Sequence, residues 1–345
     1  MADGKPDQTT PERIPVTLLA GFLGSGKTTL ANRILSEQHG QRIAVIVNEF
    51  GDVGIDGHLV VGVEDNVVQL SNGCICCTVR NDLQETLLSL LKQRHQLARA
   101  EPFERVLIEA SGLASPGPAV QTILMDPVLS SQLQLDGVIT MTHAQHIMQQ
   151  LLDHPEASDQ VGYADHIILN HCDQSDTEGI EAAEASIRAC NGNAELVRTT
   201  RASVDVLSLL NTNTWELRRA QRAQQAVHVH DDTCEETHDS HDDMPHHTSG
   251  VGTLSLRMKD PLDLNRLKMW LLFLAKRQSH ELMRLKGILH CQHHEKPILV
   301  QGVYQWLELQ TAPDDVPEES VLVLIGRHLD EAELRREWDD CRART

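Results

Sequence analysis

Residues 21–29, with the sequence Gly-Phe-Leu-Gly-Ser-Gly-Lys-Thr-Thr, lie between an apolar run at 16–20 and a helical pattern that starts at Thr29. Glycines at three positions allow tight turns, so that successive N–H groups and the next helix N-terminus converge on one anion. Lys27 is expected to reach the β- and γ-phosphates of a nucleoside triphosphate, and the Thr28 hydroxyl to bind Mg²⁺. The loop therefore predicts a phosphate cradle lined by Gly21, Gly24, Ser25, Gly26, Lys27, Thr28 and Thr29.

Three of the eight cysteines, Cys74, Cys76 and Cys77, fall within four residues after a short apolar run at 67–70. The chain opens with polar residues and has no run near the ~18 apolar residues of a membrane span, which predicts a cytoplasmic protein without membrane association. Structural disulfides are rare in that compartment, so clustered thiols favour a soft metal ion such as zinc. A redox pair and inert packing are the alternatives.

The run Val106 to Ile108 leads into Glu109-Ala110-Ser111-Gly112. In a phosphate-loop protein, the strand that leads to the second switch delivers a carboxylate near Mg²⁺ and a glycine close to the γ-phosphate. Glu109 is expected to hold Mg²⁺ through water or to orient the attacking water, and Gly112 to offer its N–H to the terminal phosphate. A strand-end acid that faces solvent is the alternative.

Another apolar run, 167–169, leads into Asn170-His171-Cys172-Asp173. A carboxylate can accept hydrogen bonds from both N1–H and the 2-amino group of guanine, which adenine cannot supply. Asp173 therefore favours GTP over ATP, and Asn170 is expected to tie this segment to the phosphate loop. A turn that merely contains Asn and Asp is the alternative.

Residues 48–56 follow the apolar run 43–47 and occupy the place of a first switch. Glu49 and Asp52 are the acids expected to contact Mg²⁺ or to complete a metal site with the three cysteines. An ordinary glycine-rich loop is the alternative for either acid.

The elements that position these residues alternate between strands and helices. Short β-rich runs fall at 16–20, 43–47, 67–70, 105–108, 135–141 and 166–169, and amphipathic segments fall at 29–38, 82–98 and 178–190. This alternation predicts an α/β fold with a mainly parallel sheet covered on both faces, and ligands at the carboxyl ends of its strands. We assign 1–13 to a disordered lead-in and 14–225 to this nucleotide-binding domain.

Residues 226–250 are rich in histidine and acidic side chains and could not form a core, which predicts a flexible linker, acting either as a weak metal store or as a plain acidic tether. Residues 251–345 return to an ordered pattern, with strands at 252–258, 281–291, 297–309 and 321–326 and helices at 262–276 and 331–338. They predict a smaller α+β domain. In it, the cluster at 290–294 is either an exposed strand turn or a metal-transfer site.

Acidic residues outnumber basic ones by 50 to 30, for a formal net charge of -20. This charge repels phosphate backbones and anionic lipids, so we expect no nucleic-acid partner.

The sequence resembles the CobW-like P-loop GTPases, which include CobW proteins, nitrile hydratase activators and zinc-regulated GTPase metalloprotein activators. The resemblance covers roughly residues 14–345 and rests on 21–29, Asn48 to Gly51, Asn72 to Cys77 and Glu109 to Gly112, with 284–288, 301–303 and 325–327 matching that family's C-terminal domain. Joined to the phosphate loop, Cys-x-Cys-Cys at this position is highly specific.

The resemblance implies a slow GTPase that binds Zn²⁺ or Co²⁺ at Cys74, Cys76 and Cys77 and delivers the metal to a client metalloprotein under nucleotide control. Ordering of the switch segments by the γ-phosphate would also arrange the thiolates. A nucleotide-gated zinc buffer or sensor without productive turnover, and an ATP-dependent small-molecule kinase, are the alternative functions. The sequence leaves open whether the protein forms a homo-oligomer.

Overall fold

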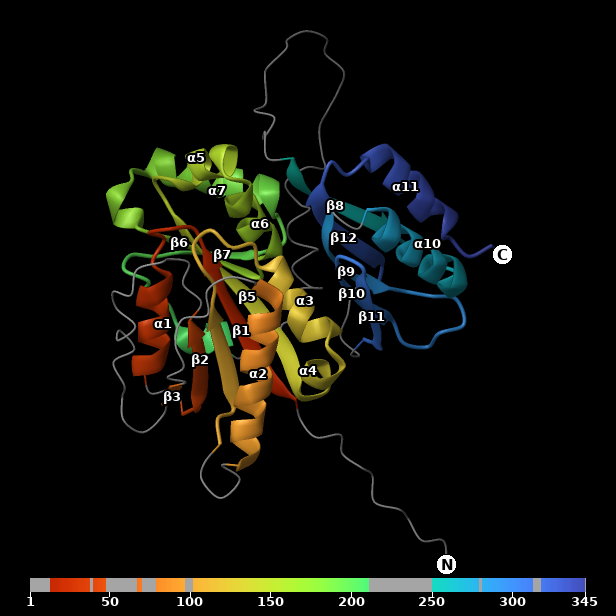
Figure 1. Cartoon of the computed structure of the whole chain (residues 1–345). Coiled ribbons are helices and arrows are strands. Elements are labelled where there is room, and N and C mark those ends of the chain that lie inside the picture. The colour runs from red at the N-terminus through yellow and green to blue at the C-terminus, as the bar shows by residue number, and fades with distance from the viewer. Residues whose placement is uncertain are drawn as a thin grey trace, which may run out of the picture.

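The computed structural model describes residues 13–37, 40–47, 67–69, 79–96, 102–210, 250–278, 281–312 and 318–344. Its N-terminal part is a parallel sheet with helices on both faces (Figure 1). The strand order is β3-β2-β4-β1-β5-β6-β7, and every neighbouring pair runs parallel. The strands are β1 (Ile14–Gly21), β2 (Ile43–Val47), β3 (Val67–Gln69), β4 (Arg105–Glu109), β5 (Leu133–His143), β6 (His166–Asn170) and β7 (Glu195–Arg198).

The sheet buries both faces because successive side chains of its strands point in opposite directions. Leu18 packs in a cluster with Leu87 of α2 (Val79–Gln96), whereas its neighbour Leu19 packs with Leu30 of α1 (Lys27–Ser36) on the other face. The helices around the sheet are α1 (Lys27–Ser36), α2 (Val79–Gln96), α3 (Gly117–Met125), α4 (Pro127–Gln132), α5 (Ile147–Asp153), α6 (Pro155–Tyr163), α7 (Thr177–Cys190), α8 (Val206–Leu210) and the short 3₁₀ helix η1 (Cys172–Gln174). The predicted doubly covered parallel sheet is confirmed.

The C-terminal part is a five-stranded antiparallel sheet with two helices, which confirms the expected smaller α+β fold. The strand order is β11-β10-β9-β12-β8. Its elements are β8 (Val251–Met258), α10 (Leu264–Arg277), β9 (Leu282–Leu289), β10 (Ile298–Val303), β11 (Trp306–Thr311), β12 (Ser320–Arg327) and α11 (Glu331–Asp340).

The expectation of one strand over 297–309 is wrong. The chain reverses between Val303 and Trp306, which pair across a hairpin of β10 and β11. Tyr304 makes the turn with a φ of 52°, in the left-handed region that glycine and asparagine usually supply. Because this turn contains neither residue, it could not be recognised from the sequence.

Both faces of the C-terminal sheet are buried. One face packs on α10 and α11, where Leu256 lies in a cluster with Leu271 and Trp338. The other face supplies Met283 and Val323 to the same apolar cluster as Leu18, so the two domains share a core. In Figure 1 the C-terminal sheet lies against the α3 and α6 side of the nucleotide-binding domain.

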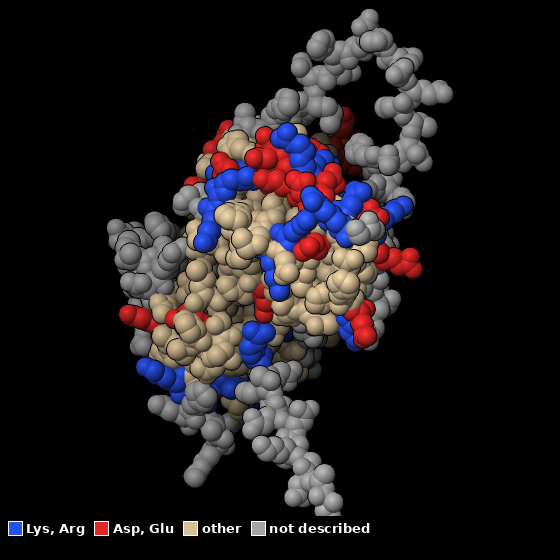
Figure 2. Space-filling model, turned by 90° about the vertical axis from the view of Figure 1, so that its right-hand side faces the viewer, with Lys and Arg blue, Asp and Glu red and all other residues tan. Residues whose placement is uncertain are grey.

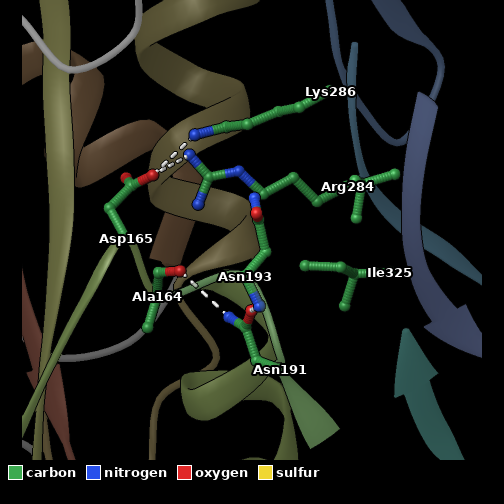
Figure 3. Close-up of a pocket in the computed structure, with 8 residues that line it drawn as sticks. Ala164, Asp165, Asn191, Asn193, Arg284, Lys286 and Ile325 are labelled. Carbon is green, nitrogen blue, oxygen red and sulfur yellow. Dashed lines mark hydrogen bonds and ion pairs between the residues drawn. The ribbon is translucent and has the colours of Figure 1, made fainter. Parts of the chain in front are cut away.

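A buried ion cluster also joins the two domains. The Asp165 carboxylate, at the start of β6, pairs with Arg284 Nη2 at 2.5 Å and with Lys286 Nζ at 2.7 Å, and both cations project from β9 (Figure 3). The exposed fractions of these side chains are 1% for Asp165, 3% for Arg284 and 15% for Lys286. Asp165 Oδ2 also accepts a hydrogen bond from the Val138 amide at 2.8 Å.

Figure 2 shows that acidic and basic side chains are interleaved on the face that carries the C-terminal domain. In the C-terminal domain, Arg277 of α10 pairs with Glu337 of α11 at 2.8 Å, and Arg335 pairs with Glu331 at 2.7 Å. No described helix is both long and apolar enough to span a bilayer.

Candidate nucleotide site

The phosphate loop begins where β1 ends and α1 starts. Gly21, Gly24 and Gly26 have φ values of 137°, 74° and 106°, which side chains other than glycine rarely adopt. A Cβ built on Gly26 would lie 2.5 Å from Asn170 Nδ2, so close approach also requires glycine there. Helix α1 begins at Lys27, two residues before the predicted start, because the turn at Gly26 already leads into its first turn.

Inside the loop, polar side chains fold back onto one carbonyl. Ser25 Oγ donates to Phe22 O at 2.8 Å, and Lys27 Nζ donates to the same oxygen at 3.2 Å. Lys27 is buried, whereas Thr28 and Thr29 are exposed at the start of α1. The loop is thus held by its own side chains, with the two threonines facing solvent.

The structure brings the predicted Mg²⁺ ligands together. Thr28 Oγ1 donates to Glu109 Oε1 at 2.8 Å, although 81 residues separate them in the sequence. Parallel pairing of β1 with β4 places Leu19 beside Glu109, which is buried at the end of β4. A hydroxyl and a carboxylate at the mouth of a phosphate loop are the hard oxygen donors that Mg²⁺ prefers.

The segment after Glu109 runs past the phosphate loop. Gly112 is buried, and a Cβ built on it would lie within 3.0 Å of the Leu23 backbone nitrogen. Its carbonyl accepts a hydrogen bond from Gln160 Nε2 at 3.1 Å. This glutamine was not predicted, because helix α6 was not predicted. The one available signal was Pro155 at the first position of α6, a common helix start.

Asn170 ties the segment after β6 to the phosphate loop, and this contact was expected from the sequence. It is almost fully buried at the end of β6; its Nδ2 donates to Ser25 O at 3.0 Å, and its Oδ1 accepts from the Ala202 amide at 3.0 Å. Asp173 lies in η1 with an exposed side chain, three residues along.

His171 belongs to a group of three neighbouring histidines, with His143 and His146. Its φ is 60°, and its ring stacks on the ring of His143 with centroids 4.2 Å apart and planes 11° apart. His143 in turn lies 4.3 Å from the ring of His146. Burial, followed by the neighbouring charges of His171 and His146, lowers the pKa of His143 to about 4. The sequence did not indicate this histidine group, because His143 is the last residue of β5 and belongs to no recognised motif.

The other predicted metal ligands lie outside the described residues: Glu49, Asp52, Cys74, Cys76 and Cys77. The histidine-rich stretch within 226–250 also lies there, apart from Gly250. Within the described ranges, no three metal-ligating side chains gather around a point that could hold an ion, and this includes the cluster at 290–294. His293 and His294 are exposed beside the end of β9, as in the strand-turn interpretation.

Two cysteines of the C-terminal domain are poor thiolate donors. Burial raises the pKa of Cys291 to about 11 and that of Cys341 to about 12, so both thiols stay protonated at neutral pH. A protonated thiol is a weak metal ligand.

The phosphate loop between β1 and α1, with its contacts to Glu109 and Asn170, defines a P-loop nucleotide-binding domain. Comparison with known protein families identifies the family. The family model described as "CobW/HypB/UreG, nucleotide-binding domain" matches residues 15–198, and that of the "Cobalamin synthesis protein cobW C-terminal domain" matches residues 251–342. The chain belongs to the CobW family of P-loop GTPases.

Relatives match over nearly the whole length. The chain is 34% identical over 328 residues to the zinc chaperone YjiA of Escherichia coli, covering 93% of this chain and 96% of that protein. It is 29% identical to the zinc-regulated GTPase metalloprotein activator 1 of Schizosaccharomyces pombe, covering 93% and 84%. The crystal structure of the Zn(II)-bound YjiA GTPase superposes with a TM-score of 0.70 at 32% identity, covering 96% of this chain and all of that one.

Proposed function

We propose that this protein is a GTP-hydrolysing metallochaperone that binds Zn²⁺, or Co²⁺, through Cys74, Cys76 and Cys77 and passes it to a client metalloprotein under nucleotide control. The observation that carries the nucleotide part is the contact between Thr28 and Glu109, which joins the phosphate loop to the second switch. The metal part is supported by the full-length similarity to a zinc chaperone and to a zinc-regulated metalloprotein activator.

In this proposal, Lys27 and Gly112 contact the phosphates, Thr28 and Glu109 hold Mg²⁺, and Asp173 selects guanine. Glu49 or Asp52 adds a carboxylate to the three thiolates. The cysteines stand between the first and second switch segments in the sequence, so the nucleotide state that orders those segments would also change the metal ligands.

The direct test is a competition titration of the purified protein with a zinc chelator in three states: bound to GTP, bound to GDP, and free of nucleotide. We expect different zinc affinities in the GTP and GDP forms. Equal affinities in all three states would refute nucleotide-controlled delivery. GTP turnover that is absent both with and without zinc would instead favour a zinc buffer.

The metal ligands are tested by Cys76→Ser, which should weaken zinc binding at least about tenfold, or about 1.4 kcal/mol. The matched control is Cys341→Ser, since the Cys341 thiol is buried in the C-terminal domain and protonated. GTP binding should be nearly unchanged in both variants. If Cys76→Ser bound zinc as tightly as Cys341→Ser, the site assignment would be wrong.

A further inference from the structure

The segment 112–117, which follows Glu109 and runs to the start of α3, is held at both ends by groups outside it. At its first end, Gln160 Nε2 donates to Gly112 O at 3.1 Å and to Ala114 O at 3.0 Å. Gln160 is 1% exposed, and its main-chain carbonyl oxygen accepts a hydrogen bond from Thr140 Oγ1 at 2.7 Å. One buried side-chain amide therefore fixes two carbonyls of the loop, those of Gly112 and Ala114.

At its other end, the segment meets a residue of the C-terminal domain. A Cβ built on Gly117 would lie 2.5 Å from the Tyr304 hydroxyl oxygen and 2.7 Å from that of Tyr163. The two tyrosine rings lie 5.8 Å apart. Tyr304 occupies the β10–β11 turn with its left-handed φ of 52°, which is costly for a bulky side chain and is maintained only where surrounding contacts require it.

Helix α6, which carries Gln160, is itself fixed by the C-terminal domain. Arg327 of β12 pairs with Asp159 of α6, and Arg284 of β9 donates to the carbonyl oxygen of Tyr163. Helix α3 likewise contacts β10 and β11 (Figure 1). Both supports of the 112–117 segment thus lead to the C-terminal sheet.

We propose that Gln160 and Tyr304 are positioning residues for GTP hydrolysis, through which the C-terminal domain sets the orientation of Gly112 toward the terminal phosphate. The inference rests on the proposed role of Gly112. Neither side chain touches the reacting atoms; each acts through the backbone of the 112–117 segment. A change of client or metal that moved the C-terminal sheet would then alter the hydrolysis rate.

The test uses Gln160→Met, which keeps the side-chain length but removes both donors, and Tyr304→Phe, which removes only a hydroxyl. The control is Trp270→Phe, because the Trp270 Nε1 hydrogen bond to Glu337, 2.8 Å long, lies wholly within the C-terminal domain. Each full-length variant is checked by thermal unfolding, and kcat, KM, and affinities for GDP and a non-hydrolysable GTP analogue are then measured.

We expect Gln160→Met to lower kcat about tenfold and Tyr304→Phe about threefold. In both variants the affinity for the GTP analogue should fall relative to that for GDP, because Gly112 serves only the terminal phosphate. The double variant should lose less than the product of the single effects, since both residues support one segment. Trp270→Phe should change none of these quantities.

A folded Gln160→Met protein with wild-type kcat, or with equal losses for GDP and the GTP analogue, would overturn this inference. Failure of the proposed GTPase function can be distinguished from failure of this inference. If the wild-type protein bound ATP and GTP equally or did not hydrolyse GTP, the GTPase assignment would fall, while the ratio of analogue to diphosphate affinities would still decide the role of Gln160.

Discussion

The buried ion cluster between the domains gives a quantitative prediction. In Asp165→Asn, the amide oxygen can still accept from the Val138 amide, but the guanidinium of Arg284 and the ammonium of Lys286 lose their shared carboxylate. Arg284 is only 3% exposed, so water cannot replace that charge. Breaking a buried ion pair by removing one partner costs about 3–5 kcal/mol, and we expect a loss of unfolding free energy in that range.

The assay is urea denaturation, followed by tryptophan fluorescence and by far-ultraviolet circular dichroism. Trp270, Trp306 and Trp338 all lie in the C-terminal domain, so fluorescence reports mainly on that domain. If Asp165→Asn loosens the interface first, the fluorescence transition moves to lower urea than the dichroism transition, and unfolding is no longer a single step.

Two further variants isolate the cause. Asp260→Asn removes the partner of Arg342 from a pair 3.2 Å long with exposed fractions of 53% and 59%, and should cost less than about 1 kcal/mol. Adding Arg284→Met and Lys286→Met to Asp165→Asn removes the uncompensated charges and should restore most of the loss. If Asp165→Asn were as mild as Asp260→Asn, the interface would not depend on these charges.

Two other predictions concern the nucleotide site. Asn170→Ala leaves Ser25 O and the Ala202 amide without their buried partner, so the unfolding free energy should fall by about 2–4 kcal/mol without nucleotide; unchanged stability in urea would contradict the tie. The second prediction concerns His143, whose pKa is about 4 in the folded protein and 6.5 ordinarily. Between these two pH values the unfolded chain binds a proton at His143 and the folded protein does not. The stabilising contribution of neutral His143 is therefore complete above about pH 6.5 and is lost as the pH falls toward 4. His143 faces His146, His171 and Asp173. In His143→Phe the decline of unfolding free energy from about pH 7 to about pH 4.5 should be shallower, and an equal slope in both proteins would contradict this cause.

The sequence predicted the parts of the site that depend on local backbone chemistry. Three glycines in nine residues require positive φ values, and Gly21, Gly24 and Gly26 adopt them. The buried runs that became β1, β2, β4 and β6 were recognisable because parallel strands covered on both faces are continuously apolar. Once these strands lie side by side, their carboxyl ends bring Thr28 to Glu109 and Asn170 to Ser25.

The short helices α3 to α6 were not predicted, for a different reason. Each spans at most nine residues, too few to show an amphipathic period, and three of them begin at or beside a proline that reads equally well as a loop. Their helical state depends on packing, as shown by Val120 and Leu129, which are fully buried against the sheet. The contacts of Gln160 with the 112–117 segment could be recognised only once α6 was known.

The contacts between domains lie furthest from what a sequence can indicate. Asp165 and Arg284 are 119 residues apart and lie in different domains, whereas Gly112 and Gln160 are 48 residues apart, on a loop and a helix of the same domain. No motif marks them, because a carboxylate before a strand or a glutamine in a helix is commonly exposed. Yet these residues connect the segment after Glu109 to the C-terminal sheet. The residues expected at the phosphates can therefore be recognised from sequence motifs. The residues that connect this site to the second domain can be identified only from the folded structure.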